Sequence, residues 1–312
     1  MYAAAMQNRP LALVALFVVN LIYGVNYVVA KGLMPQVIGP SGFILLRAIG
    51  AVSLFWIVRA FRPESVAPQD AVRLLLCAVF GVALNQLMFF QGLMRTSPIH
   101  ASVIMLATPI LVLVGSGVLL GERITLRKLN GVALGTAGAL GIIFVRAPEG
   151  VSSPLGDLFI LINAASFAIY LVMVKPLMKK YTAITIMSWT FLLGALFVLP
   201  FGAGELADVR WTELTTAQIG AMLFVVLLVT FVAYLLNTWA LRHVEASVVG
   251  TFIYLQPILA MVISVVYARY GQALIGRSAD YVEGIGWFQW ICTGMIFIGV
   301  HLVTRADATM KR

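Results

Sequence analysis

Arg47 is the residue with the clearest chemical signal, because it lies inside an apolar run that extends from Ser41 to Arg59. A run of about 20 apolar residues predicts a membrane-crossing helix. Arg47 lies about seven residues into this run, or ~10 Å deep at 1.5 Å per residue. A charge at such a depth costs about 2.5–3.5 kcal/mol and therefore should face a cavity or a partner. One interpretation is an anchor for a carboxylate or phosphate; the other is a side chain that snorkels outward or caps helix carbonyls.

Two prolines interrupt long apolar runs at similar places. Pro109 follows Thr108, and Pro257 follows Gln256. Proline removes a backbone hydrogen bond and kinks a helix, and matched interruptions in two halves of a transporter point to a binding site. We therefore expect both prolines to be hinges, with Thr108 and Gln256 covering freed carbonyls or contacting a solute. The alternative is that the prolines only shape the bundle.

Amide and phenol side chains recur along single helical faces of other apolar runs. Asn20, Tyr23 and Tyr27 are spaced i, i+3, i+7. Such groups would be unsatisfied in lipid, so their faces should point inward. For any one residue, an interhelical hydrogen bond of about 0.6 kcal/mol is the simpler interpretation; for the set, a polar cavity is favoured. The candidate solute-binding residues are Asn20, Tyr23, Tyr27, Arg47, Asn85, Thr108, Asn163, Tyr170, Tyr234, Asn237 and Gln256.

The composition sets the class of protein that must position these residues. Of 312 residues, 62% are hydrophobic and 11% are charged, whereas a soluble domain carries roughly 25% charged residues. This excludes soluble enzymes and nucleic-acid binders. The net charge of +9 is typical of Lys and Arg in cytoplasmic loops, and nucleic acid is not expected as a partner.

The sequence predicts an all-α integral membrane protein with ten transmembrane helices. With the N-terminus inside, 14 of the 21 Lys and Arg residues fall in inner loops, which places both termini in the cytoplasm of a bacterial inner membrane. The ten apolar runs are 11–30, 41–59, 71–94, 99–120, 129–145, 157–175, 183–200, 217–241, 246–268 and 285–304.

A weak internal repeat divides the chain. Residues 101–103 and 246–248 both read Ala-Ser-Val, and each precedes a proline in its run. We expect one five-helix repeat over 1–148 and another over 149–312. Because five is odd, the second repeat must enter the membrane from the opposite side. Inverted repeats are a recurrent build of secondary transporters, with the site near the midplane, although channels also contain them.

Five motifs occur in a recognisable order and spacing: 23–27 (Tyr-Gly-Val-Asn-Tyr), 46–47 (Leu-Arg), 101–109, 119–123 (Leu-Leu-Gly-Glu-Arg) and 131–138. This pattern resembles the EamA-type members of the drug/metabolite transporter superfamily. The resemblance implies a ten-helix bundle that moves small metabolites, amino acids or drugs, commonly outward. It also associates the fifth and tenth helices with dimer contacts, so a homodimer is one interpretation of the glycines in 131–138, beside packing within the chain. The second half departs from the pattern, with Arg-Tyr-Gly at 269–271 where Gly-Glu is expected.

The motifs of other function classes are missing from the sequence. It contains no phosphate-binding Gly-x-x-x-x-Gly-Lys loop, no nucleophile elbow and no His/Cys cluster for a metal, so we expect neither a cofactor nor an enzyme. No acidic residue lies in the middle of a run, which weakens obligate proton antiport and leaves a facilitator or exchanger open. We expect Glu122 to be an exposed loop charge, or to pair with Arg123, Arg127 or Lys128. The preferred interpretation is an exporter of amino acids or similar metabolites; a channel and a membrane-embedded lipid enzyme are the alternatives.

Overall fold

The computed structural model describes residues 8–95, 104–144, 153–256, 258–259, 262–263 and 287–310. These residues are largely helical and contain no β-strand. Helical segments occur in each of the ten predicted runs. Within the described residues, six helices are long and apolar enough to cross a membrane, and shorter apolar helices lie at Ala107–Leu120 and Trp290–Ala306. The chain is therefore an all-α multi-span membrane protein.

The helices before residue 145 form the first half of the described chain. The third predicted run is one continuous helical rod, in which a π-helical segment joins two α-helices. The elements are α2 (Arg9–Leu33), α3 (Pro40–Ala60), η1 (Pro68–Asp70), α4 (Ala71–Ala78), η2 (Val79–Ala83), α5 (Leu84–Leu93), α7 (Ala107–Leu120) and α8 (Leu126–Phe144).

The helices after residue 152 form the second half. Its third rod also contains a π-helical segment, η4, so the two halves carry the same irregularity at corresponding places. The elements are α9 (Pro154–Leu177), α10 (Ala183–Ala207), η3 (Trp211–Glu213), α11 (Thr216–Phe224), η4 (Val225–Val232), α12 (Ala233–Ala240), α13 (Ala246–Thr251), η5 (Phe252–Tyr254) and α15 (Trp287–Met310).

Local sequence signals explain several helix ends. Proline is the first residue of α3 and of α9. An N–H at this position would have no intrahelical partner, so its absence in proline costs no hydrogen bond. Thr182 caps α10 by accepting a hydrogen bond from the Thr185 N–H at 3.3 Å. Gly121 ends α7 with φ of +66°, a left-handed conformation that glycine adopts without a Cβ penalty.

The helix α10 differs from its predicted length. A polar connector was expected from residue 201, but α10 continues to Ala207. The reason is a tertiary contact: Glu205 in the last turns of α10 accepts a hydrogen bond from the backbone N–H of Gly42 at 2.8 Å. This bond uses a free N–H at the start of α3 and ties the extra helical turns to that helix.

The helices α3 and α10 pack antiparallel, and each end of the pair is closed by a carboxylate. At one end Glu205 accepts from Gly42 N; at the other, Glu64 accepts from Thr182 N at 3.0 Å. Glu205 is 141 positions after Glu64, and Ala183, which follows Thr182, is 141 positions after Gly42. Each half therefore supplies a carboxylate that accepts a hydrogen bond from a backbone N–H at the start of a helix in the other half.

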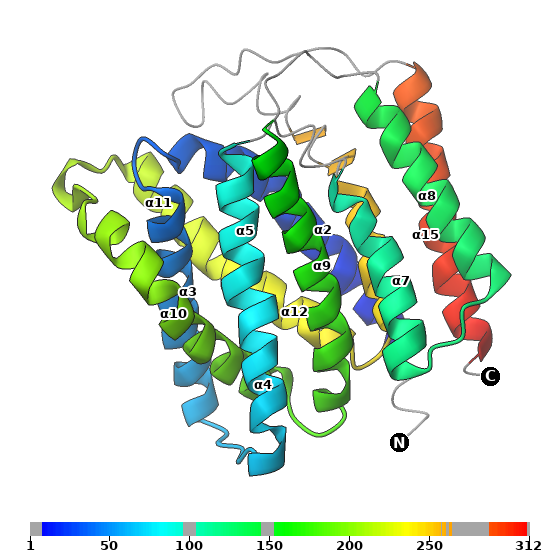
Figure 1. Ribbon diagram of the computed structural model, residues 1–312, viewed down its shortest axis with the longest axis horizontal. Helices are drawn as coiled ribbons and strands as arrows, with labels where there is room; N and C mark the ends of the chain where they lie inside the picture. Colours follow the sequence, from blue (N-terminus) through cyan, green and yellow to red (C-terminus); the bar gives the residue numbers. More distant parts are fainter. Residues whose placement is uncertain are drawn as a thin grey trace.

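The helices α8 and α15 form a second antiparallel pair at one edge of the bundle (Figure 1). A Cβ built on Gly131 would lie 2.7 Å from the carbonyl oxygen of Gly299, and one on Gly138 would lie 2.6 Å from that of Cys292. The glycines near the middle of α8 thus let the two backbones approach closely. Packing within the chain occupies this glycine face.

An ion network connects the halves at the end of the bundle where α2 begins and α15 ends. Glu122 accepts from Lys175 Nζ at 2.9 Å and from the N–H of Ala246, at the start of α13, at 3.0 Å. Lys128 lies 4.0 Å from Glu122 and also pairs with Glu245. The side chain of Glu122 is 7% exposed, so the expectation of an exposed loop charge was wrong, because Glu122 pairs with Lys175 and with the start of α13. Of the alternative partners expected for Glu122, Lys128 lies within pairing distance.

Candidate solute-binding cavity

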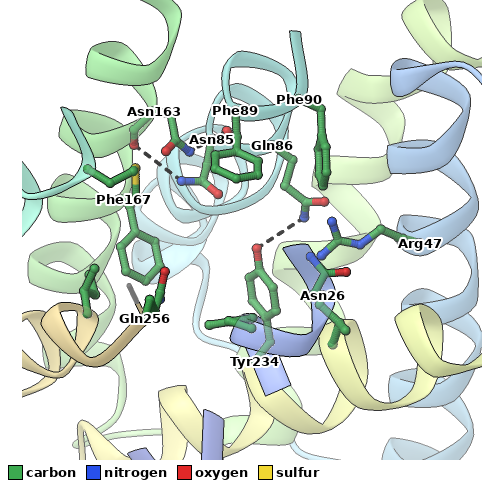
Figure 2. A pocket seen from close by; sticks show the side chains of 14 residues that line it. Asn26, Arg47, Asn85, Gln86, Phe89, Phe90, Asn163, Phe167, Tyr234 and Gln256 are labelled. Carbon is green, nitrogen blue, oxygen red and sulfur yellow. Dashed lines mark hydrogen bonds between the residues drawn. The ribbon is translucent and has the colours of Figure 1, made fainter. Parts of the chain in front are cut away.

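A cavity lies at the centre of the bundle, between helices of both halves (Figure 2). It holds ≈ 650 Å³ of atom-free space, including the part that is open to solvent. Its lining combines amide, phenol and guanidinium groups with aromatic and aliphatic side chains, and the two kinds are interspersed (Figure 2). The lining residues are Tyr23, Asn26, Arg47, Asn85, Gln86, Phe89, Phe90, Met105, Asn163, Phe167, Val229, Tyr234, Ile253 and Gln256.

Arg47 on α3 is the only charged lining residue that the described part of the chain supplies. It is 4% exposed, and its Nε donates a hydrogen bond to Thr230 Oγ1 at 2.9 Å. The guanidinium carbon lies 5.3 Å from the ring centre of Phe90 and 5.7 Å from that of Phe43. Among the described residues, no carboxylate lies within 4.0 Å of Arg47. The side chain therefore does not reach solvent, and its charge is buried without a counter-ion from these residues.

The π-helical segment η4 positions the partner of Arg47. The hydroxyl of Thr230 donates to the carbonyl oxygen of Val225 at 2.8 Å, five residues earlier. It can accept from Arg47 at the same time, because a hydroxyl has one donor and two acceptor sites. The irregular helix of the second half thus orients the cation supplied by the first half.

Asn85 on α5 and Asn163 on α9 hold the two halves together at the cavity wall. Asn163 Nδ2 donates to the backbone carbonyl of Asn85 at 2.7 Å, and Asn85 Nδ2 donates to that of Asn163 at 3.4 Å. Gln86, the next residue on α5, donates from Nε2 to the Tyr234 hydroxyl at 3.4 Å. Both contacts are drawn in Figure 2. In each contact the side-chain amide nitrogen is the donor, and the amide oxygen of the same side chain takes no part in the hydrogen bond.

Backbone interruptions lie next to both predicted hinge positions. Leu106 forms a turn immediately before α7 begins at Ala107, so Pro109 lies in the first turn of that helix. In the second half, η5 precedes Gln256, and Pro257 lies outside the described residues. The residues four positions before the prolines, Met105 and Ile253, both line the cavity. A proline has no N–H to donate to these carbonyls, and irregular backbone occurs close to Met105 and Ile253.

The structure brings only part of the candidate set to the cavity. Tyr23, Arg47, Asn85, Asn163, Tyr234 and Gln256 line it. Asn20 is buried behind the wall, where its Oδ1 accepts from Gln256 Nε2 at 3.0 Å. Tyr170 lies away from the lining and shares a 2.9 Å hydrogen bond with Thr238. Thr108 and Asn237 are buried but are not among the lining residues, and the side chain of Tyr27 lies outside the described residues.

The candidate set omits several of the lining residues. Asn26 and Gln86 lie beside candidate positions, and the signal that could have identified them is the clustering of amides in the first and third runs. The apolar lining residues had no such signal, because every face of these runs is apolar. They are Phe89, Phe90, Met105, Phe167, Val229 and Ile253.

Comparison with known proteins identifies the family to which this sequence is similar. The sequence profile of the EamA-like transporter family matches residues 10–144 and 154–271. The chain belongs to the EamA-like transporter family. An uncharacterized transporter of Archaeoglobus fulgidus is 27% identical over 267 residues, covering 84% of this chain and 85% of that protein. The uncharacterized transporter YetK of Bacillus subtilis is 27% identical over 304 residues, covering 95% and 89%.

The fold of this EamA-like chain also matches a solved crystal structure. The TM-score is 0.73 at 16% sequence identity, over 96% of this chain and 99% of the other. At this identity the likeness concerns the fold alone. Membership of the EamA-like transporter family makes the chain a multi-span membrane transporter.

Proposed function

We propose that the protein is a secondary transporter that exports amino acids or similar small metabolites across the bacterial inner membrane by alternating access. One observation carries this proposal: the guanidinium of Arg47 is buried in a cavity built by both halves and has no carboxylate partner among the described residues. An uncompensated buried charge is strongly unfavourable. A solute carboxylate would supply the missing counter-charge.

The rest of the lining supports an amphipathic solute of amino-acid size. The side chains of Phe89, Phe90 and Phe167 offer aromatic surface, while Asn26, Gln86 and Tyr234 offer hydrogen-bonding groups. A small number of polar groups in a mainly apolar pocket fixes the orientation of a ligand.

The contacts between the halves support alternating access as the mechanism. The cavity residues come from helices before residue 145 and after residue 152, so a movement of one half relative to the other changes the cavity. The network of Glu122, Lys175, Lys128 and Glu245 joins the halves at one end. Opening that end requires these ion pairs to separate, whereas opening the other end does not.

The proposal also covers the orientation of the protein in the membrane and its oligomeric state. The excess of Lys and Arg in the predicted inner loops supports termini in the cytoplasm. A homodimer would have to use the outward-facing sides of α8 and α15, because their glycine faces contact each other within the chain.

Flux measurements in liposomes test the transport proposal. We expect the purified protein to move radiolabelled amino acids above the rate of empty liposomes. Arg47→Ala should lower this flux by about tenfold or more, since a hydrogen bond to a charged group contributes about 1.5–3 kcal/mol. Arg47→Lys keeps the charge but loses the geometry of the Thr230 contact, and it should retain part of the flux.

The matched control is Arg210→Ala, since Arg210 has a 78% exposed side chain. Wild-type flux in this variant, with reduced flux in Arg47→Ala, supports the anchor. No flux of a broad amino-acid panel would overturn the transport proposal, and single-channel currents would replace it with a channel.

A further inference from the structure

Two contacts between the halves each pair a glycine with a valine. Gly50 of α3 lies against Val226 of η4, and a Cβ built on this glycine would overlap Cγ1 of the valine. Gly194 of α10 lies against Val82 of η2, and a Cβ built there would lie 2.6 Å from Cγ1 of Val82. Because glycine has no Cβ, each valine packs directly on the backbone of a helix in the other half.

These two glycine–valine contacts occupy corresponding places in the halves. Gly194 is 144 positions after Gly50, and Val226 is 144 positions after Val82. Each glycine lies within the second long helix of its half, and each valine lies in the π-helical segment of the third rod. Exchanging the two halves would therefore map each contact onto the other.

The π-helical segments connect the glycine–valine contacts to the cavity. Asn85 and Gln86 line the cavity and follow η2 directly after Leu84, while Val229 lines it from within η4. A π-helical segment is rare in proteins and frequently occurs at a functional site. A rotation of one half against the other at the two valines would therefore move the walls of the cavity.

Alternating access makes opposite demands on the contacts between two such halves. In a transporter with inverted repeats, the state open to the other side forms when each half adopts the conformation of its partner. A contact that has an equivalent in the other half is preserved by this exchange, whereas a contact without an equivalent is broken. The Glu122 network is of the second kind, since residues 269–271 read Arg-Tyr-Gly where the sequence would need a second Gly-Glu.

We propose that the two glycine–valine contacts are the pivot on which the halves turn, and that they stay closed in both end states while the Glu122 network separates. This inference rests on the proposed transport function and on the predicted inversion of the repeats. It adds to them the part of the interface that does not open.

Cross-linking tests whether the pivot stays closed during transport. A Cβ built on Gly50 would lie 3.4 Å from the Cβ of Val226, and disulfides have a mean Cβ separation of about 3.8 Å. We expect Gly50→Cys/Val226→Cys to form a disulfide on oxidation. The oxidised protein should keep its amino-acid flux within about twofold of the reduced form, because a hinge does not have to separate.

The matched pair lies in the Glu122 network, where Lys128 pairs with Glu245. Joining Lys128→Cys/Glu245→Cys with a cleavable bifunctional thiol reagent should abolish flux, and a reductant should restore it. The native Cys77 and Cys292 are buried, and the single-cysteine variants show whether either of them reacts.

A second measurement needs no solute and no cross-link. Asn26→Cys places a thiol on the cavity lining, and a membrane-impermeant maleimide labels it in right-side-out or inside-out vesicles from whichever side is open. In this background Lys175→Met, which removes a partner of Glu122, should raise labelling from the predicted cytoplasmic side severalfold. Gly194→Ala disturbs the pivot equally in both end states, so it should leave the ratio of labelling from the two sides unchanged. The control is Gly220→Ala on α11, where a Cβ meets nothing within 4 Å.

The outcomes separate the pivot from the transport proposal. If the Gly50–Val226 disulfide blocks flux, or if Gly194→Ala shifts the labelling ratio as Lys175→Met does, the pivot is overturned. An unchanged ratio in Lys175→Met would mean that the network does not separate, and it would overturn the inference as well. If labelling responds as expected but no amino acid of a broad panel crosses, the proposed solute class fails and the pivot stands. The labelling ratio decides the matter even if the disulfide variant does not fold.

Discussion

The carboxylate of Glu122 carries more contacts than a loop acid normally does. It accepts from Lys175 Nζ, from the N–H of Ala246 and from the Ser247 hydroxyl at 3.0 Å. Ala246 begins α13, so the acid also lies at the positive end of a helix dipole. Burial by itself raises the pKa of Glu122, but Lys175, the Ala246 N–H and Lys128 lower it more, and the net pKa is below the usual value.

The lowered pKa of Glu122 gives stability that depends on pH. Because the folded-state pKa is below the unfolded value of about 4.3, the contribution is present above pH ~4.3 and is lost as pH falls through the folded pKa. We expect Glu122→Gln to lower the free energy of unfolding by about 3 kcal/mol at pH 7. The difference from wild type should shrink at low pH. Thermal unfolding in detergent from pH 3 to 7 measures both effects.

The exposed acid Glu213 provides the control for this experiment. Its side chain is 65% exposed and pairs only with Arg210, at 3.4 Å, so Glu213→Gln should change stability by less than about 1 kcal/mol. If Glu122→Gln unfolded like wild type at pH 7, the network would not stabilise the fold.

Single residues differ in how far sequence could predict them. The burial of Arg47 was predictable, since a charge within an apolar run has few other places to go. The burial of Glu122 was not, because its partners Lys175 and Ala246 are 53 and 124 positions away. A local pattern contains no information about contacts at that separation.

The elements show the same division between local and distant causes. Each of the ten predicted runs contains a helical segment among the described residues, because length and hydrophobicity determine a membrane span. The π-helical segments η2 and η4 were not predicted. A π-helix changes the helical period, and this change leaves no trace in a sequence that is apolar on every face. Their stabilising contacts are tertiary: Ser166 Oγ donates to the Phe80 carbonyl in η2 at 2.7 Å.

The close contact of α8 and α15 depends on the glycines at their crossing. We expect Gly299→Ala to destabilise the protein by about 1–3 kcal/mol through overpacking, because its Cβ would lie 2.6 Å from the Gly131 carbonyl oxygen. A backbone oxygen in a packed helix cannot move aside easily. Thermal unfolding of the purified protein in detergent provides the measurement.

Gly294→Ala is the matched control on the same helix. A Cβ there meets nothing within 4 Å, and alanine favours helix over glycine by up to about 1 kcal/mol. This variant should melt at or slightly above the wild-type temperature. Equal melting of both variants would mean that the glycine contact does not determine the approach of α8 and α15.

At the scale of the whole molecule, the predicted inversion would explain why distant segments resemble each other. Glu64 and Glu205 close opposite ends of the α3 and α10 pair through equivalent contacts. The Glu122 network has no such counterpart in the sequence, because residues 269–271 read Arg-Tyr-Gly. Among the described residues, the Glu122 ion network lies at one end of the bundle, so we expect the states open at either end to differ in free energy.

The inverted repeats make a topological prediction that reporter fusions test. Arg9 donates a hydrogen bond to the Thr304 carbonyl, so α2 begins where α15 ends (Figure 1), and the charge bias predicts that this end lies in the cytoplasm. If the repeats are 1–148 and 149–312, five crossings separate residue 150 from either terminus. Alkaline phosphatase, active only outside the cytoplasm, should be active when fused after residue 150 and inactive after residue 312. Green fluorescent protein should give the reverse.

The same result at both positions would contradict an odd number of crossings in each repeat, and with it the inversion on which alternating access depends.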